Sequence, residues 1–374
     1  MYGSSFRSRS ELVSAVGTII VCLAPGCGTD GSAPAAPAAR TLSIVDSIGV
    51  AAGDSDYVFG SIDRVCFGAD GSILVLDRIS CCIRVFDAGG GLVRTAGGQG
   101  SGPGEYMNPT DMAVLGDGRV IVCDIFTGGV HLLDTDLVDQ GVRMPFYSDP
   151  PFSPVGTAES SFVAGQLLVE PSEDGVDATF LVGRFDLSED ASAVYFERTW
   201  EADPTRFTEI VDNVMHSAAW TADASGNVYC APMSFDSYEI TGTTPDGTVI
   251  LSVSLPVERV ARTPEEIADE KAFIDRRIAS MGSSLAVDYE PSPWRYQISQ
   301  LGIDGDGNLW VLRGTTEVPT FDVWDAGGNR LYTVTVPGAG ADGIYWRFAI
   351  GDHRIAAWSD DPVDYPKVYL LELR

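Results

Sequence analysis

The strongest constraint on the fold of this chain is a pattern that recurs six times along its sequence. Each copy has an apolar strand, a tight turn rich in Gly, Asp or Asn, and a second apolar strand, as in VCFGADGSILVLD and MAVLGDGRVIVCD. The aligned turn residues are spaced 47, 47, 61, 81 and 46 residues apart, and they are Gly71, Gly118, Gly165, Gly226, Gly307 and His353. Self-similarity at such a spacing is typical of blade or solenoid architectures.

Several copies continue into a second hairpin, as in VFDAGGGLVRTA and VWDAGGNRLYTVTV. Two hairpins make four antiparallel strands, and six such sheets around an axis make a propeller. We therefore predict an all-β fold: a six-bladed β-propeller of four-stranded antiparallel blades, with one helical insertion between blades 4 and 5. The last copy lacks an outer strand, and we expect TLSIVDSIGV, residues 41–50, to supply it and close the ring.

The first two copies, over Ser61 to Asp134, also resemble NHL repeats. They share a Gly-rich connector, a Pro, an inner strand, an Asp-Gly turn, an apolar strand ending in Asp, and a third strand of the kind seen in IRVFD. The resemblance implies an NHL-repeat-like six-bladed β-propeller of the bacterial secreted or lipoprotein type.

The Gly-rich run GGQGSGPGEYMNP, Gly97 to Pro109, could be mistaken for a phosphate-binding loop. A dinucleotide fingerprint needs a helix after its glycines, so that the helix N-terminus meets the phosphate. Here a strand and hairpin follow, with a Pro where a helix would begin, and the lysine of a P-loop is missing. We therefore interpret the run as a connector between blades.

The insertion, at about residues 257–294, contains the one helix that the sequence predicts. Thr263 and Glu266 have capping-box spacing, and Pro264 suits the first helical position. Its apolar residues fall on one helical stripe, and they are Ile267, Ile274, Ile278 and Met281. The helix either packs on the propeller or forms a lid near a ligand site.

The N-terminus indicates an export signal. Two arginines precede the apolar run LVSAVGTIIVCLA, which is short for a membrane span, and the run ends in LAPGC. By resemblance to bacterial lipoproteins, residues 1–26 form a signal peptide and Cys27 becomes the lipidated first residue; ordinary secretion is the alternative. Residues 27–40 form a flexible tether, and 41–374 form a single propeller domain. We expect a location in the bacterial cell envelope, lipid-anchored at the periplasmic or outer-membrane face.

Charge narrows the range of partners. The chain has 24 Lys and Arg against 53 Asp and Glu, a net charge of −29. Such a surface repels phosphate backbones, which argues against nucleic acid. We expect a monomer that meets the membrane only through its lipid anchor, with a small molecule, glycan or peptide as the unknown partner.

Five cysteines remain beyond the signal region, with a spacing that matches no zinc motif. Cys66, Cys123 and Cys230 lie within apolar strand patterns and are predicted to be buried thiols. The neighbours Cys81 and Cys82 could instead form a strained vicinal disulfide.

Antiparallel geometry places the starts of all inner strands, the connectors and the helical insertion on one face. Side chains seven to ten positions before each aligned turn should meet there, at the mouth of the central channel. The candidate ligand-binding residues are Asp63, Arg64, Asp111, His216, Gln300 and Arg347. In so acidic a chain Arg64 and Arg347 could hold a carboxylate or sulfate, or simply pair with Asp63 and Asp111.

Catalytic and metal motifs are sparse. Only three His occur, and His131 and His353 are not expected to converge with His216, which argues against a three-His zinc site. A calcium site from Asp63 and Asp111 with Asp77 or Asp124 is an open alternative, although we predict no cofactor. DGDGN, Asp304 to Asn308, mimics an EF-hand start but lacks its later ligands.

Three functions remain open. The favoured one is an envelope-anchored propeller that binds a ligand or partner on the connector face without catalysis. The alternative is a metal-assisted lyase or hydrolase of the propeller lyase or lactonase kind, with a carboxylate-rich axial site. A purely structural envelope module is the third, because fold alone does not decide function.

Cys27→Ala should move the protein from the membrane fraction to the soluble fraction, because acyl chains would supply its membrane affinity. Fractionation of cells expressing each form measures this. An unchanged membrane fraction for the variant would count against lipidation.

Overall fold

The structure of the chain is a computed structural model. It describes residues 38–146, 149–157, 160–172, 175–187, 191–202, 213, 217–280, 290–314 and 316–374. The predicted signal peptide, Cys27, most of the tether and His216 therefore lie outside the described residues. No helix among the described residues is long and apolar enough to span a membrane.

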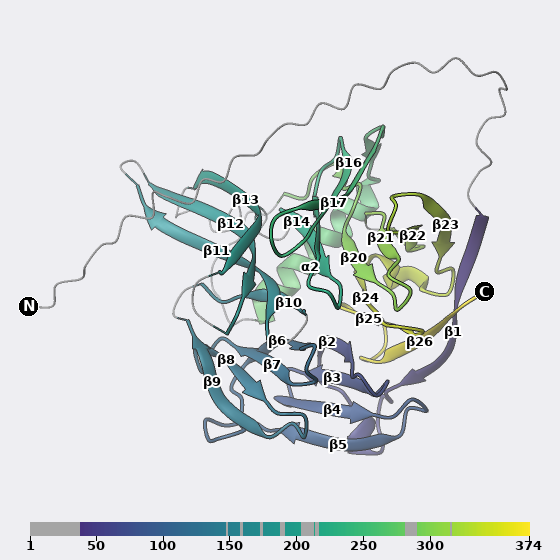
Figure 1. Cartoon of the computed structure of the whole chain (residues 1–374). Helices are drawn as coiled ribbons and strands as arrows, with labels where there is room; N and C mark the ends of the chain where they lie inside the picture. Colours follow the sequence, from purple (N-terminus) through teal and green to yellow (C-terminus); the bar gives the residue numbers. More distant parts are fainter. Residues whose placement is uncertain are drawn as a thin grey trace, which may run out of the picture. The chain divides into compact units, whose positions relative to one another are not determined.

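Six antiparallel blades surround a central axis, with the first strand of each blade innermost (Figure 1). The first three blades are β2 (Ile62–Phe67), β3 (Ile73–Asp77), β4 (Cys82–Phe86), β5 (Leu92–Gly97); β6 (Pro109–Val114), β7 (Val120–Asp124), β8 (Gly129–Leu133), β9 (Asp139–Pro145); and β10 (Phe152–Gly156), β11 (Phe162–Pro171), β12 (Val176–Phe185), β13 (Ala193–Ala202).

The remaining blades complete the ring, so the predicted six-bladed propeller is confirmed. They are β14 (Ala218–Ala222), β15 (Val228–Pro232), β16 (Tyr238–Thr243), β17 (Val249–Leu255); β20 (Gln300–Ile303), β21 (Leu309–Leu312), β22 (Thr320–Trp324), β23 (Arg330–Thr335); and β24 (Trp346–Ile350), β25 (Ile355–Ser359), β26 (Val368–Leu373) with β1 (Ala38–Ile48). Short 3-10 turns lie at Ser55–Tyr57 and Gly340–Tyr345.

The ring closes through β1, as the missing outer strand of the last copy predicted. Residues 42–48 of β1 pair antiparallel with β26. Residues 38–41 also pair in parallel with β23, the outer strand of blade 5, so blades 5 and 6 share one eight-stranded sheet. This second pairing was not predicted. It makes use of residues 38–40, which the sequence analysis assigned to the tether.

The hydrophobic core lies between blades rather than on the axis. Six buried clusters each join one blade to the next, and the cluster between blades 6 and 1 packs Trp358 and Val368 against Ile62 and Val65. The middle strands are covered on both faces, so β3, β4, β7 and β8 are buried along their whole length. Burial on both faces explains why these strands are continuous apolar runs in the sequence.

Two buried carboxylates hold the start of the first two blades. Asp77, at the end of β3, accepts hydrogen bonds from the backbone N–H groups of Gly60 and Ser61, just before β2. Asp124, at the end of β7, accepts in the same way from Met107 and Asn108, just before β6. The repeated Asp therefore attaches each connector to its own blade.

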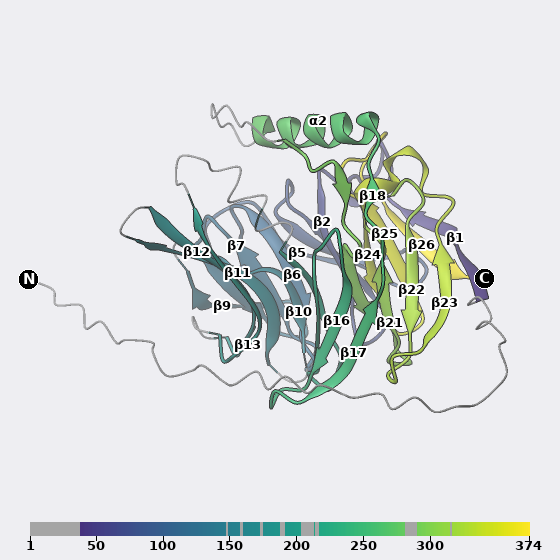
Figure 2. The ribbon, with the colours of Figure 1, turned by 90° about the horizontal axis from the view of Figure 1, so that it is seen from above.

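The helix of the insertion, α2 (Pro264–Ser280), lies across the connector face of the propeller (Figure 2). Its N-terminus is the predicted capping box: Glu266 N–H donates to the Thr263 hydroxyl, and Thr263 N–H donates to the Glu266 carboxylate. A small hairpin, β18 (Val260–Ala261) and β19 (Trp294–Arg295), joins the two ends of the insertion.

The side chains through which α2 contacts the ring are half-buried or exposed. Phe273 packs against Tyr345 with 4.8 Å between ring centroids, and Arg276 pairs with Asp361. Ile274, from the predicted apolar stripe, lines a small cavity beneath the helix. The helix therefore lies on the face where the channel opens.

Blade 3 differs from the alignment of the repeats. Gly165 was aligned with the turn residues, but it lies inside β11 and pairs with Phe152 of β10. A Cβ at Gly165 would approach the side chains of Phe152 and Trp220 to 2.6 and 2.7 Å, so packing rather than a turn demands glycine here. The inner strand β10 ends at Gly156, which pairs with Phe162 of β11, and Thr157 is therefore at the far end of the inner strand.

The five cysteines beyond the signal region are all free thiols. Cys123 and Cys230 are buried as predicted, and Cys66 is half-buried beside the channel. Cys81 and Cys82 are buried and unlinked, so the structure does not contain the vicinal disulfide that the sequence left open.

Deleting residues 41–50 should destabilise the ring, because β1 buries Leu42 and Ile48 and covers the edge of β26. Leu42→Ala alone should cost about 2–5 kcal/mol as a core truncation. The thermal midpoint and light scattering of the deletion variant measure the effect, with a chain that begins at Ala38 as the control. An equal midpoint for the deletion and the control would contradict closure by β1.

Candidate functional site

An open channel of about 1300 Å³ runs along the axis and is lined by the inner strands of all six blades and by the insertion. Five of the six candidate residues line this one cavity, and they are Asp63, Arg64, Asp111, Gln300 and Arg347. They come from blades 1, 2, 5 and 6. The sixth, His216, lies outside the described residues.

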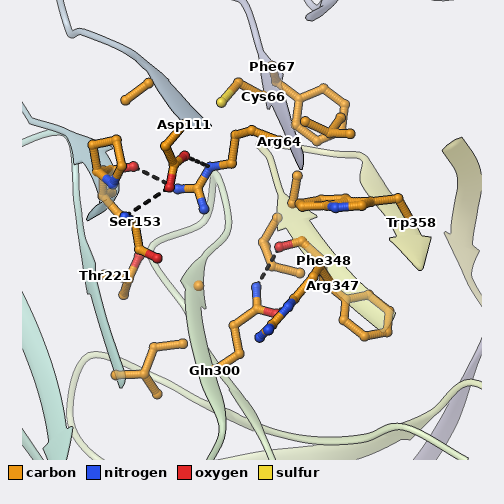
Figure 3. A pocket seen from close by; sticks show the side chains of 18 of the residues that line it. Arg64, Cys66, Phe67, Asp111, Ser153, Thr221, Gln300, Arg347, Phe348 and Trp358 are labelled. Carbon is orange, nitrogen blue, oxygen red and sulfur yellow. Dashed lines mark hydrogen bonds and ion pairs between the residues drawn. The ribbon is translucent and has the colours of Figure 1, made fainter. Parts of the chain in front are cut away.

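Arg64 and Asp111 form a salt bridge between blades 1 and 2, with 3.4 Å between Nε and Oδ1 (Figure 3). Arg64 Nη2 also donates to the Pro154 carbonyl at 2.6 Å. Asp111 accepts hydrogen bonds from the N–H groups of Met112 and Ser153, both at 2.9 Å. The pairing of Arg64 with Asp111 was one of the two alternatives that the sequence left open.

Ser153 extends this network and was missed by sequence reasoning. Its φ is +48°, a left-handed conformation that is uncommon for a residue with a Cβ. Its N–H points at Asp111, and its carbonyl accepts a hydrogen bond from Trp220 Nε1 at 3.1 Å. The polar network therefore runs through four consecutive blades. The misplaced turn in blade 3 hid Ser153, because it moved the expected channel residues to Thr157.

The strand pairing is irregular at the start of three inner strands, beside Arg64, Asp111 and Ser153. This irregularity orients their backbone toward the channel. The register shifts between Ile62 and Arg64, between Pro109 and Asp111, and between Phe152 and Val155. Such bulges redirect side chains and are frequent beside functional sites. Blades 1 to 3 therefore present their polar groups to the channel by the same device.

Gln300 has a different role, because both ends of its amide are occupied. Its Nε2 donates to the Phe348 carbonyl at 2.5 Å, and its Oε1 accepts from the Phe348 N–H at 3.2 Å. The side chain therefore acts like one more backbone pair and ties blade 5 to blade 6.

Arg347 projects from β24 into the channel beside Gln300, and its side chain is 49% exposed (Figure 3). Its Nε donates to Asp360 at 2.7 Å. The charge of Asp360 raises the pKa of Arg347, while the charge of Arg64 acts against it. The sequence left a ligand, Asp63 or Asp111 as the partner of Arg347; the structure pairs its Nε with Asp360, and the ligand stays a prediction.

Two contacts hold Asp63 within blade 1. Its Oδ2 accepts from Arg78 Nε at 2.8 Å, and its Oδ1 accepts from the Ser61 hydroxyl at 2.6 Å. The suggested pairing of Asp63 with Arg64 or Arg347 stays a prediction. Burial raises the pKa of the Asp111 carboxyl and of the Cys66 thiol, which lie near Arg64.

The suggested calcium ligands do not converge. Asp77 and Asp124 turn away from the axis toward backbone N–H groups, and Asp77 also pairs with Arg84 at 3.2 Å. Among the described residues, no group of three or more His, Cys, Asp or Glu side chains is arranged to hold a metal ion.

Comparisons with known proteins agree with the architecture. A family model described as a 6-bladed beta-propeller, DUF5128, matches residues 53–137. This segment covers blade 1 and the first three strands of blade 2, where the NHL-like pattern is clearest. The chain is a six-bladed β-propeller. No curated protein sequence matches it.

Solved structures of bacterial proteins share the fold at low identity. A member of the DUF4221 family from Bacteroides vulgatus is 9% identical, with a TM-score of 0.54 over 90% of this chain and 98% of that one. Virginiamycin B lyase from Staphylococcus aureus is also 9% identical, with a TM-score of 0.47 over 89% of this chain and 99% of the lyase. The likeness to the DUF4221 protein agrees with the propeller fold, and at 9% identity it leaves activity open.

Gln300→Leu should lower the free energy of unfolding by about 1–3 kcal/mol for each Phe348 backbone group left without a partner. Urea unfolding followed by fluorescence measures the change. Gln140→Leu, at an exposed position, is the matched control. Equal midpoints for the two variants would mean that the Gln300 amide does not hold blades 5 and 6 together.

Proposed function

We propose that this propeller binds a small ligand at the connector-face mouth of its channel and performs no chemistry on it. The observation that supports this most directly is the single 1300 Å³ cavity that collects charged side chains from separate blades. Ligand sites are concave places where a few polar groups converge among apolar walls. The mouth has this character, since the half-buried rings of Phe152 and Trp220 line the same cavity as Arg64, Asp111 and Arg347.

The insertion supports the same location for binding. Arg262, Glu270 and Arg295 from this segment line the channel together with the inner strands. Arg262 pairs with Glu270, and Arg295 pairs with Glu266, so ion pairs fix the start of α2 beside the opening. In this proposal the helix borders the bound ligand and restricts its exchange with solvent.

The proposal includes a location. The chain would be held at the bacterial envelope as a monomer through a lipid on Cys27, with residues 28–37 as the tether. Its acidic surface would keep it soluble and away from nucleic acid, which leaves a small molecule, glycan or peptide as the ligand.

Thr110→Trp should block the mouth, because Thr110 is half-buried beside Asp111 and lines the cavity. A metabolite and oligosaccharide library is screened by thermal shift against the wild-type protein, and each hit is then titrated against the variant. We expect at least one compound to stabilise the wild-type protein and to lose affinity at least about 10-fold in the variant. Thr135→Trp, on an exposed turn, is the matched control.

Three outcomes would oppose the proposal. Hits that bind the blocked variant as well as the wild type would place binding elsewhere, and a library without hits would favour a structural module. Conversion of a hit, detected by mass spectrometry, would favour the metal-assisted lyase or hydrolase, and elemental analysis of the purified protein would then identify the metal.

A further inference from the structure

The open guanidinium of Arg347 points to the class of ligand, and this inference rests on the proposed function. Arg347 lies on an innermost strand, where an exposed side chain faces the channel. Only its Nε is occupied, by Asp360. Its two terminal nitrogens have no hydrogen-bond partner among the residues that the structure describes. The outer edge of this guanidinium therefore presents parallel N–H groups to the cavity.

Arg64 adds a second cation to the same opening. Its Nε and Nη2 are used by Asp111 and Pro154, and its side chain also bonds the Cys66 thiol, so Arg64 contributes charge rather than an open donor edge. The positive charges of Arg64 and Arg347 oppose one another, as the pKa of Arg347 reflects. Asp111 and Asp360 each pair with one of these arginines, and an anion at the cavity would be attracted by both guanidiniums.

The distribution of charge along the channel favours binding of an anion at the mouth rather than at the far end. Acidic residues exceed basic ones by more than two to one in the chain. At the far end of the channel three carboxylates, Asp70, Asp223 and Asp352, outnumber one cation, Arg354, in the turns that follow the inner strands. These carboxylates repel an anion there, whereas the guanidiniums at the mouth attract it.

We propose that the mouth binds a ligand through a carboxylate group, with Arg347 donating two parallel hydrogen bonds and the positive charge of Arg64 lying on the adjacent blade. A planar guanidinium edge matches a planar carboxylate in a bidentate arrangement. The rest of the ligand would extend along the half-buried rings of Phe152 and Trp220. Asp360 acts as a positioning residue, because it fixes Arg347 by its Nε and leaves the outer edge open.

The test uses three probes of one shape. These are 2-naphthoate, its neutral isostere 2-naphthamide, and 2-naphthyl phosphate, each measured by equilibrium dialysis against the wild-type protein. We expect 2-naphthoate to bind at one site per chain, at least about 10-fold more tightly than the amide. Tighter binding of the phosphate than of the carboxylate would overturn the choice of a planar carboxylate.

Variants of Arg347 test whether this residue causes the preference for 2-naphthoate over 2-naphthamide. Arg347→Gln should weaken 2-naphthoate binding about 10- to 100-fold and leave 2-naphthamide unchanged. Arg347→Lys keeps a charge for Asp360 but removes the two parallel donors, so it should lose most of the affinity while preserving the thermal midpoint. Arg354→Gln is the matched control, because Arg354 lines the far end of the same channel.

The outcomes separate this inference from the proposed function. Equal binding of 2-naphthoate and 2-naphthamide, both blocked by Thr110→Trp, would leave the channel as a binding site and overturn the anion preference. Full binding of 2-naphthoate to Arg347→Gln and Arg347→Lys would also overturn it. Absence of binding by all three probes would overturn the inference for ligands of this class, and the library screen would then decide the proposed function.

Discussion

The hydrogen bonds between β1 and β26 join the beginning and the end of the propeller, and every channel contact depends on that junction. In this ring the N-terminal segment covers the edge that β26 would otherwise expose. Because β1 also pairs with β23, blades 5 and 6 move as one sheet. These are the blades that carry Gln300 and Arg347, so closure of the ring also fixes one wall of the mouth.

The two walls of the mouth are stabilised by different means. Blades 1 to 4 are linked by charged and polar groups, from Arg64 through Asp111 and Ser153 to Trp220. Blades 5 and 6 are linked by the Gln300 amide and by apolar packing. In the first network the charge of Arg64 is paired with Asp111 inside the protein. Arg347, by contrast, keeps its outer edge open to the channel, which makes it the focus of the proposed ligand site.

Particular residues show how far the site could be predicted. Antiparallel geometry was enough to bring Asp63, Arg64, Asp111, Gln300 and Arg347 to one cavity, because inner strands of a propeller all begin at the same face. Their partners were not predictable. Asp360 and Arg78 come from turns between second and third strands, where spacing carries no information about side-chain direction. Ser153 was hidden because its strand, which contains a proline and a bulge, lacks the regular alternation of its counterparts.

The sequence by itself determined the blade number, the closing strand, the helical insertion and its cap, because each follows from local periodicity or from hydrogen bonds between near neighbours. Tertiary structure alone decided which charges pair across blades, that Asp77 and Asp124 turn to backbone N–H groups instead of the axis, and that Gly165 serves packing. These contacts join residues that are distant in the chain or depend on small shifts of register. A repeat pattern fixes where each blade begins, but only packing between blades fixes where each side chain points.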